Sequence, residues 1–173
     1  MVLGSDPPDG LADSKKLTAR RRADLEVRIK STCQWAVGVA SVEEIDRFNI
    51  FAATMLAMTR AVAGLCAGIE GKPANVLVDG NKTPEGRCKD WRWPARAIVG
   101  GDAIEPCISA ASIIAKEHRD RLMRDLALSH PFYGWERNAG YGTREHMAAL
   151  RRHGLSPHHR RSFAPVAQLE MEL

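Results

Sequence analysis

Long apolar runs are missing from this sequence. None approaches the roughly 20 consecutive apolar residues that a membrane-spanning helix needs. The first ten residues, MVLGSDPPDG, also lack the basic start and the long apolar stretch of a secretory signal. Together these absences predict a cytoplasmic protein with no membrane segment.

Paired cysteines are missing as well. The cysteines are scattered, with no C-x-x-C pair and no cysteine–histidine spacing of the kind found in zinc sites. This pattern argues against a zinc site and predicts free, mostly buried thiols in a reducing compartment. The four residues are Cys33, Cys66, Cys88 and Cys107.

The length and the composition are those of one soluble globular domain. The chain has 173 residues, enough for one domain with a core and too few for two comfortable ones. Its hydrophobic fraction of 45% and charged fraction of 27% are ordinary for this class. We expect a single domain over residues 1–173, in which residues 166–173 form a flexible tail. The net charge of +4 mildly favours a polyanionic partner such as nucleic acid.

Helical and strand patterns alternate along the chain. Asp13 or Ser14 is suited to cap a first helix, and Ser41 and Glu44 have the spacing of a capping box. The run NVLVDG has the continuous apolar character of a parallel strand that is buried on both faces. This alternation predicts an α/β fold. We expect helices over residues 13–31, 49–65, 109–128 and 143–154, strands over 33–41, 75–80 and 95–102, and a loop over 130–146.

Two of these strands end in an aspartate beside a glycine, namely Asp79 and Asp102. In open α/β sheets, ligands bind at the carboxyl edge of the strands. Carboxylates that meet there bind hard cations such as Mg²⁺ or share acid–base work. Beside a basic surface, such a pair suits metal-dependent phosphodiester chemistry. An aspartate–glycine pair at a strand end is also a common turn, so both interpretations remain open at this point.

Five segments in a fixed order resemble ribonuclease HII, the type 2 ribonuclease H. They are DSKKL (13–17), NVLVDGN (75–81), GGD…SAASIIAKEHRD (100–120), GYGT (140–143) and HHRRSF (158–163). The resemblance covers residues from about 11 to 165. It implies the ribonuclease H fold, with a mixed five-stranded sheet flanked by helices.

The resemblance also implies an activity and a cofactor. The family hydrolyses the RNA strand of RNA–DNA hybrids and incises duplex DNA on the 5′ side of a single embedded ribonucleotide. It uses Mg²⁺ or Mn²⁺ held by four carboxylates, and it leaves a 3′-hydroxyl and a 5′-phosphate. By resemblance, the protein is expected to be a monomer.

The family's motifs place roles on individual residues of this chain. Asp79 and Asp102 correspond to metal-binding catalytic aspartates, and Tyr141 corresponds to the tyrosine that stacks at the RNA–DNA junction. Such stacking suits a ring that senses the step between ribose and deoxyribose. The two histidines of HHRRSF are not expected to bind metal, because Mg²⁺ prefers oxygen ligands.

The resemblance also suggests basic and polar contacts to the substrate. Lys15 and Lys16 resemble phosphate contacts supported by a helix N-terminus, although a solvated helix start is an equal alternative. Ser112 and Lys116 share a helix face by their spacing, although the small residues of SAAS also favour close packing of that helix on the sheet. Arg160, with Arg161, is placed to touch backbone phosphate, and we expect the nearby Phe163 to pack against the core.

One family segment has no counterpart in this sequence. The family has a strand with adjacent Asp and Glu in a pattern like D-E-x-G-R-G, and no segment here matches it. Two of the four carboxylates and the segment that recognises the ribose 2′-hydroxyl are therefore lacking. We expect a chain that is incomplete at its N-terminus and weak or inactive as a nuclease. We also expect it to be poorly stable, aggregation-prone or dependent on another chain. A misassigned start, a fragment or a degenerate, non-catalytic nucleic-acid-binding homologue would each account for this.

Overall fold

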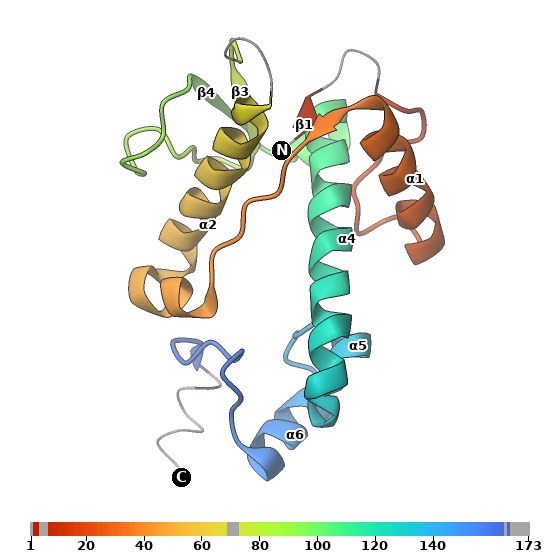
Figure 1. Cartoon of the computed structure of the whole chain (residues 1–173), viewed down its shortest axis with the longest axis vertical. Helices are drawn as coiled ribbons and strands as arrows, with labels where there is room; N and C mark the ends of the chain where they lie inside the picture. Colours follow the sequence, from red (N-terminus) through yellow and green to blue (C-terminus); the bar gives the residue numbers. More distant parts are fainter. Residues whose placement is uncertain (1, 4–6, 69–72, 165, 167–173) are drawn as a thin grey trace. The chain divides into compact units, whose positions relative to one another are not determined.

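The computed structural model describes residues 2–3, 7–68, 73–164 and 166. The chain separates into two compact units, and each is described here by itself. The first comprises residues 1–41 and 50–117, and the second comprises residues 42–49 and 118–173. Figure 1 shows the order of the elements along the chain. A single domain over residues 1–173 stays a prediction. Residues 167–173 of the expected tail lie outside the described residues, whereas Val166 is buried.

A parallel strand pair in the first unit carries the end of the NVLVDG segment. Strands β3 (Val76–Asp79) and β4 (Ala95–Ile98) pair in parallel, with Asp79 opposite Ile98. Val76 and Val78 are buried and Leu77 is half-buried, so one face of β3 is more deeply covered than the other. The expectation of burial on both faces was therefore wrong, whereas the parallel pairing is confirmed.

A second, antiparallel pair joins two very short strands, β1 (Val2–Leu3) and β2 (Gln34–Trp35). The strand expected over residues 33–41 is thus reduced to two residues. The backbone beyond β2 passes against helix α2 at Gly38, where a Cβ atom would lie 2.0 Å from the carbonyl oxygen of Ala57. A side chain cannot be accommodated there, which explains the glycine.

Helix α1 (Ala19–Thr32) begins later than its sequence pattern suggested. Thr18 is the N-cap, and its hydroxyl accepts a hydrogen bond from the backbone N–H of Arg21. The expected start at Asp13 or Ser14 was wrong, because the Asp13 side chain accepts from the N–H of Lys15 and closes a separate turn. Such local bonds are why aspartate favours turns and caps.

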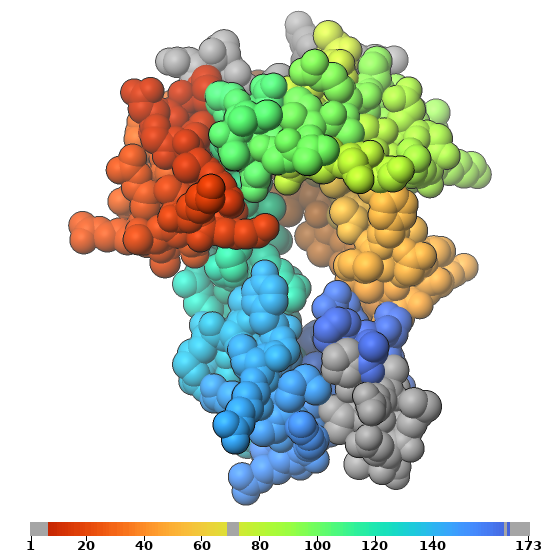
Figure 2. All heavy atoms as spheres, turned by 180° about the vertical axis from the view of Figure 1, so that it is seen from behind, coloured from red at the N-terminus to blue at the C-terminus, as the bar shows by residue number. Residues whose placement is uncertain are grey.

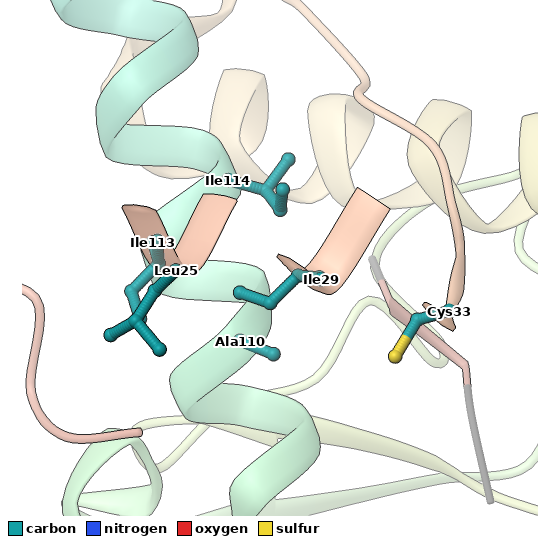
Figure 3. Close-up of a cluster of buried hydrophobic side chains, with 6 residues drawn as sticks. All are labelled: Leu25, Ile29, Cys33, Ala110, Ile113 and Ile114. Carbon is teal, nitrogen blue, oxygen red and sulfur yellow. The ribbon is translucent and has the colours of Figure 1, made fainter. Parts of the chain in front are cut away.

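One core of the first unit lies between α1 and helix α4 (Pro106–Ser129). Figure 3 shows Leu25 and Ile29 from α1 beside three small or branched residues of α4. The small side chain of Ala110 is completely buried in this core. The SAAS segment therefore packs closely against a helix, whereas packing on the sheet had been expected. The full cluster is Leu25, Ile29, Cys33, Ala110, Ile113 and Ile114.

Helix α2 (Val42–Ala67) contains one non-helical residue, Asn49, with φ 68°. Its later part packs Val62 against Val76 and Val78 of β3. By length and composition α2 is apolar enough to cross a membrane, and 33% of that window is buried. The expectation that no segment approaches the length and apolar character of a membrane span was therefore wrong. A core helix of a soluble protein passes the same test.

The second unit contains the end of α4, the one-turn helix η1 (Pro131–Tyr133), α5 (Trp135–Asn138) and α6 (Arg144–His153). Thr143 caps α6, and Gly154, with φ +74°, follows its end, which confirms the helix expected over residues 143–154. The segment expected to be a loop contains both η1 and α5. The core of this unit is formed by Met123, Ala127, Tyr133, Trp135, Leu150 and Val166.

The expected α/β class is confirmed, since a parallel strand pair is combined with a helical majority. All four cysteines are free thiols. Only Cys33 is buried and the others are half-buried, so the expectation of mostly buried thiols was wrong.

Candidate active site

Two aspartates are brought close together at one edge of the parallel pair. Asp79 ends β3, as expected. Asp102 lies in the short helix α3 (Gly101–Ile104), which follows β4, so the expectation that Asp102 ends a strand was wrong. The Oδ1 atom of Asp79 accepts a hydrogen bond from the backbone N–H of Gly101 over 2.9 Å. The carboxylate of Asp79 therefore lies against the residue that precedes Asp102.

The glycines of the GGD segment make this approach possible. Gly100 has φ +66°, a left-handed conformation that favours glycine. A Cβ atom on Gly101 would lie 2.6 Å from the Cδ1 atom of Ile108 and 3.5 Å from the Oδ1 atom of Asp79. A side chain at position 101 would thus push against the core and toward the carboxylate.

A buried serine fixes the backbone of the second aspartate. The hydroxyl of Ser109 donates to the carbonyl oxygen of Asp102 over 2.6 Å and to that of Glu105 over 3.3 Å. Ser109 is only 4% exposed, so these bonds are shielded from water. The Asp102 side chain is half-buried and that of Asp79 is exposed.

The chemistry of these donors fits Mg²⁺ or Mn²⁺, because both cations prefer carboxylate oxygens. The number of donors is the limit. Among the residues that the structure describes, no group of three or more His, Cys, Asp or Glu side chains is arranged to hold a metal ion.

Lys15 and Lys16 lie in a turn and not at a helix N-terminus. Both side chains are exposed, and the backbone N–H of Lys16 donates to the carbonyl oxygen of Asp13. The helix support expected for these lysines was therefore wrong, since α1 begins only at Ala19. Hydrogen bonds connect this turn to Arg22 of α1 and, through Arg22, to Glu117 of α4.

A buried ion pair anchors the lysine turn, and no pattern in the sequence indicated it. Arg22 Nε lies 2.9 Å from Glu117 Oε1, with side chains only 12% and 9% exposed. Arg22 Nη1 also donates to the carbonyl oxygens of Leu17 and Ser14, over 2.8 and 3.3 Å. One arginine thus joins α4 to the turn that carries the lysines.

Ser112 and Lys116 lie one helical turn apart on α4 and are both half-buried. The Ser112 hydroxyl donates to the carbonyl oxygen of Ser109 over 2.9 Å, so its proton is used inside the helix. An oxygen bonded in this way still accepts a hydrogen bond but does not donate one.

Tyr141 lies in the second unit on a tightly held loop. Its side chain is 67% exposed, and its backbone N–H donates to the carbonyl oxygen of Asn138 over 2.8 Å. The N–H of Gly140, which has φ +81°, donates to Asn138 Oδ1 over 2.8 Å. The light-blue segment around residue 140 lies at the surface on the face that Figure 2 shows. An exposed aromatic ring is therefore presented from an ordered backbone.

Arg160 belongs to a second anchored segment of this unit. Its guanidinium lies over the ring of Phe163, 4.9 Å from the centroid. Phe163 is 42% exposed, so the expectation that it packs against the core was wrong. The Asp46 carboxylate accepts from the N–H groups of Arg161 and Ser162, over 3.0 and 2.9 Å. It thereby fixes the turn that follows Arg160.

The positive charge of Arg160 contributes to the lowered pKa values of two nearby groups, Asp46 and Arg119. Partial burial alone would raise the pKa of Asp46, but hydrogen bonds from Ser162 and Arg161 and the charge of Arg160 hold it below its ordinary value. Arg119 is exposed as a residue, but partial desolvation of its guanidinium, followed by repulsion from Arg160, lowers its pKa. Two cationic side chains therefore lie near each other in this unit.

The expected site residues thus fall into two groups. The first unit contains Asp79, Asp102, Lys15, Lys16, Ser112 and Lys116. The second unit contains Tyr141 and Arg160.

Solved structures with a similar fold are known. The structure of a PCNA:RNase HII complex from Archaeoglobus fulgidus aligns with a TM-score of 0.73 and 23% identity, covering 97% of this chain and 86% of that chain. The structure of Bst-RNase HIII in complex with Mn²⁺ aligns with a TM-score of 0.71 and 18% identity, covering 94% and 58%. At these identities the likeness concerns the fold, which is that of ribonucleases HII and HIII.

Sequence relatives identify the family. The ribonuclease HII of Novosphingobium aromaticivorans is 68% identical over 173 residues, which cover 99% of this chain and 88% of that protein. The sequence model of ribonuclease HII matches residues 8–166. The resemblance found in the motifs is thereby confirmed, and the chain belongs to the ribonuclease HII family.

Proposed function

We propose that this protein is an endonuclease that cuts the RNA strand of RNA–DNA hybrids and incises duplex DNA 5′ of a single ribonucleotide. Its relatives are ribonucleases, which are hydrolases. The observation that carries the proposal is the hydrogen bond from Gly101 to Asp79, which sets one carboxylate beside the residue preceding Asp102. Such an arrangement suits metal-assisted attack on a phosphodiester.

The two aspartates would hold Mg²⁺ or Mn²⁺ against a phosphate oxygen. The chemistry that bound cations would supply here is activation of a water molecule and stabilisation of the leaving 3′-oxygen, and the products would be a 3′-hydroxyl and a 5′-phosphate. The contribution of the chain is positional. The Gly101 N–H orients the Asp79 carboxylate, and Ser109 holds the backbone of Asp102. One structural neighbour is described as a complex with Mn²⁺, which supports this cation as an alternative to Mg²⁺.

Substrate recognition is assigned to exposed aromatic and basic groups. The Tyr141 ring would stack on a base at the junction between ribose and deoxyribose, because stacking tolerates any base. Lys15, Lys16 and Arg160 would contact phosphates, which position the duplex without reading its sequence. Ser112 and Lys116 would add a second set of polar contacts. The net charge of +4 supports a polyanionic substrate.

The chain by itself is proposed to cut weakly or not at all. Two carboxylates provide little charge to fix two cations about 3.5–4 Å apart, and the described residues contain no larger group of metal ligands. The same observation favours the alternative function, a nucleic-acid-binding homologue without catalysis. In either case we propose that the protein acts as a monomer in the cytoplasm.

The discriminating experiment is cleavage of a DNA duplex that contains one ribonucleotide, with Mg²⁺ and then Mn²⁺. The chain is assayed alone and fused to a segment carrying the family's D-E-x-G-R-G pattern. We expect cleavage 5′ of the ribonucleotide only in the fused protein, lost in Asp79→Asn and Asp102→Asn. Asp90→Asn, which changes an exposed aspartate in the same region, is the matched control and should cut normally.

Two results would contradict this account. Cleavage by the chain alone would show that two aspartates suffice or that other carboxylates contribute. If neither protein cuts but both bind the duplex, the non-catalytic alternative is correct.

A further inference from the structure

A line of hydrogen bonds in the second unit ends at the backbone of Tyr141. The Nδ1 atom of His146 lies 2.9 Å from the carbonyl oxygen of Tyr141. The Nε2 atom of His146 lies 3.1 Å from the Nε2 atom of His159. The Nδ1 atom of His159 accepts from the backbone N–H of Ser156 over 3.0 Å. Two imidazoles therefore connect the Ser156 turn to the tyrosine loop.

Neighbouring groups that can only donate a hydrogen bond determine which nitrogen of each imidazole carries the proton. The indole N–H of Trp135 donates to His146 Nε2 over 3.2 Å, so that nitrogen carries no proton. The proton of His146 is then on Nδ1 and is donated to the carbonyl oxygen of Tyr141. The Ser156 N–H likewise requires an unprotonated Nδ1 in His159, whose proton is on Nε2 and is donated to His146. A single set of tautomers satisfies all four bonds.

The line is buried, although it ends at an exposed residue. His146 is 4% exposed, His159 is 7% exposed and Ser156 is 8% exposed. By contrast, the Tyr141 side chain is 67% exposed. A buried, fully bonded polar network restricts the backbone to which it is attached. The network is therefore suited to hold the tyrosine loop in one conformation.

We propose that His146 and His159 are positioning residues, which hold the Tyr141 backbone so that the exposed ring meets the nucleic acid in one fixed orientation. This inference rests on the proposed role of Tyr141 in substrate recognition. Neither histidine touches the substrate. Their effect on binding passes through Tyr141, and it requires the tautomers that these hydrogen bonds set.

The surroundings of His159 keep it neutral. Burial is the largest influence that lowers its pKa, and the nearby His146, His158 and His130 lower it further, while the bond from Ser156 acts in the opposite direction. The rings of Tyr133 and Trp135 also pack against it, at 4.7 and 5.1 Å between centroids.

Protonation of His159 would break the line. A second proton on its Nδ1 atom would point at the N–H of Ser156, where two donors then face each other. The Ser156 hydroxyl, 2.9 Å from Nδ1, is the remaining group that would accept this proton. Its oxygen already accepts from the backbone N–H of His158 over 3.2 Å and would use its second lone pair for this proton, whereas the bond from the Ser156 N–H would be lost.

The test is a double-mutant cycle on duplex binding by the full chain. Affinity is measured for a duplex with one ribonucleotide and for the same duplex made only of DNA, with no catalytic metal added. His146→Leu removes the donor to Tyr141, whereas the similarly sized His146→Asn keeps a side-chain N–H near the Nδ1 position. His153→Leu, an exposed histidine on the same helix, is the control.

We expect His146→Leu to weaken binding of the ribonucleotide duplex by about threefold to thirtyfold, a part of what loss of one stacked base costs. His146→Asn should restore most of that affinity, and His153→Leu should have no effect. In a Tyr141→Ala background, His146→Leu should cost less than about twofold more, because coupled residues are not additive. An equal loss in both backgrounds would overturn the inference.

The failure of the underlying function is distinguishable. If Tyr141→Ala leaves binding unchanged, the proposed role of Tyr141 is wrong. If Tyr141→Ala weakens binding while a folded His146→Leu does not, only the positioning inference is wrong. Should the leucine variant fail to fold, nitrogen NMR of the unmodified chain decides. A proton on Nδ1 of His146 and on Nε2 of His159 is expected, and either opposite tautomer would overturn the proposal.

Discussion

The carboxylate of Asp79 accepts a hydrogen bond from the backbone N–H of Gly101 over 2.9 Å. Gly101 opens helix α3, whose first N–H groups have no partner within the helix. Asp79 therefore provides a hydrogen-bond acceptor for the first N–H group of α3, and it is also the candidate metal ligand. The first role needs an acceptor atom and the second needs a negative charge, so substitutions can separate them.

The first prediction concerns the lack of space for a side chain at Gly101. Gly101→Ala would place a Cβ atom 2.6 Å from Ile108 Cδ1 and 3.5 Å from Asp79 Oδ1. Overpacking of this kind costs about 1–3 kcal/mol, so the free energy of unfolding should fall by that amount. Urea denaturation followed by circular dichroism measures it.

The neighbouring glycine is the matched control for this variant. Gly100 has φ +66°, and a Cβ atom there would meet no atom within 4 Å. Gly100→Asn should be nearly neutral, because asparagine tolerates the left-handed conformation better than other side chains. If both variants cost the same, crowding at Gly101 is not what matters.

The second prediction concerns the buried pair of Arg22 and Glu117. Arg22→Met removes one partner and leaves the Glu117 charge buried and unpaired, which typically costs about 3–5 kcal/mol. The melting temperature should fall, and the turn that contains Lys15 should become more accessible to trypsin, since Arg22 also bonds the carbonyl oxygen of Leu17. Hydrogen exchange would show the same loosening.

A double variant tests the origin of that cost. Arg22→Met combined with Glu117→Leu removes both charges, so it should recover much of the stability lost in the single variant. A double variant that is less stable than Arg22→Met would mean that the pair is not the dominant interaction at this position.

The third prediction is a pH dependence of stability. In the folded protein the pKa of His159 is lowered from 6.5 to about 4. The unfolded chain then binds more protons than the folded chain between these values, so stability is full above pH 6.5 and is lost as the pH falls toward 4. The loss from this one group is about 3 kcal/mol, since one pKa unit corresponds to about 1.4 kcal/mol.

A neutral substitution isolates this contribution. His159→Gln keeps a donor near the Nε2 position and does not titrate, so its unfolding free energy should fall less between pH 6.5 and 4 than that of the unmodified chain. His153→Gln, at an exposed position, should keep the original pH dependence. Parallel curves for the unmodified chain and His159→Gln would show that His159 is not the titrating group.

The sequence predicted the elements that depend on local pattern. The NVLVDG segment and the first part of the expected strand over residues 95–102 form the parallel pair, helix α6 lies within residues 143–154, and Asp79 is found at the strand edge. Each of these features follows from apolar runs or from turn and cap residues within a few positions.

Features that depend on distant residues were not predictable. Arg22 and Glu117 are separated by 95 positions, and no local pattern marks either as a partner of the other. Helix α1 begins at Ala19 because Thr18 caps it and Asp13 closes its own turn, a competition between two suitable capping residues. The His146–His159 contact likewise joins a helix to a turn, and only the folded unit reveals it.

The measurement that tests the metal site most directly is the broadening of backbone amide signals by Mn²⁺ in NMR spectra of the full chain. We predict that the strongest broadening is at Gly80 and Gly101, and that Asp79→Asn abolishes it while Asp90→Asn does not. Asp79→Asn keeps an oxygen acceptor for the Gly101 N–H, so the fold should be retained. Broadening that is centred elsewhere, or that is unchanged in Asp79→Asn, would contradict the assignment of Asp79 as a metal ligand.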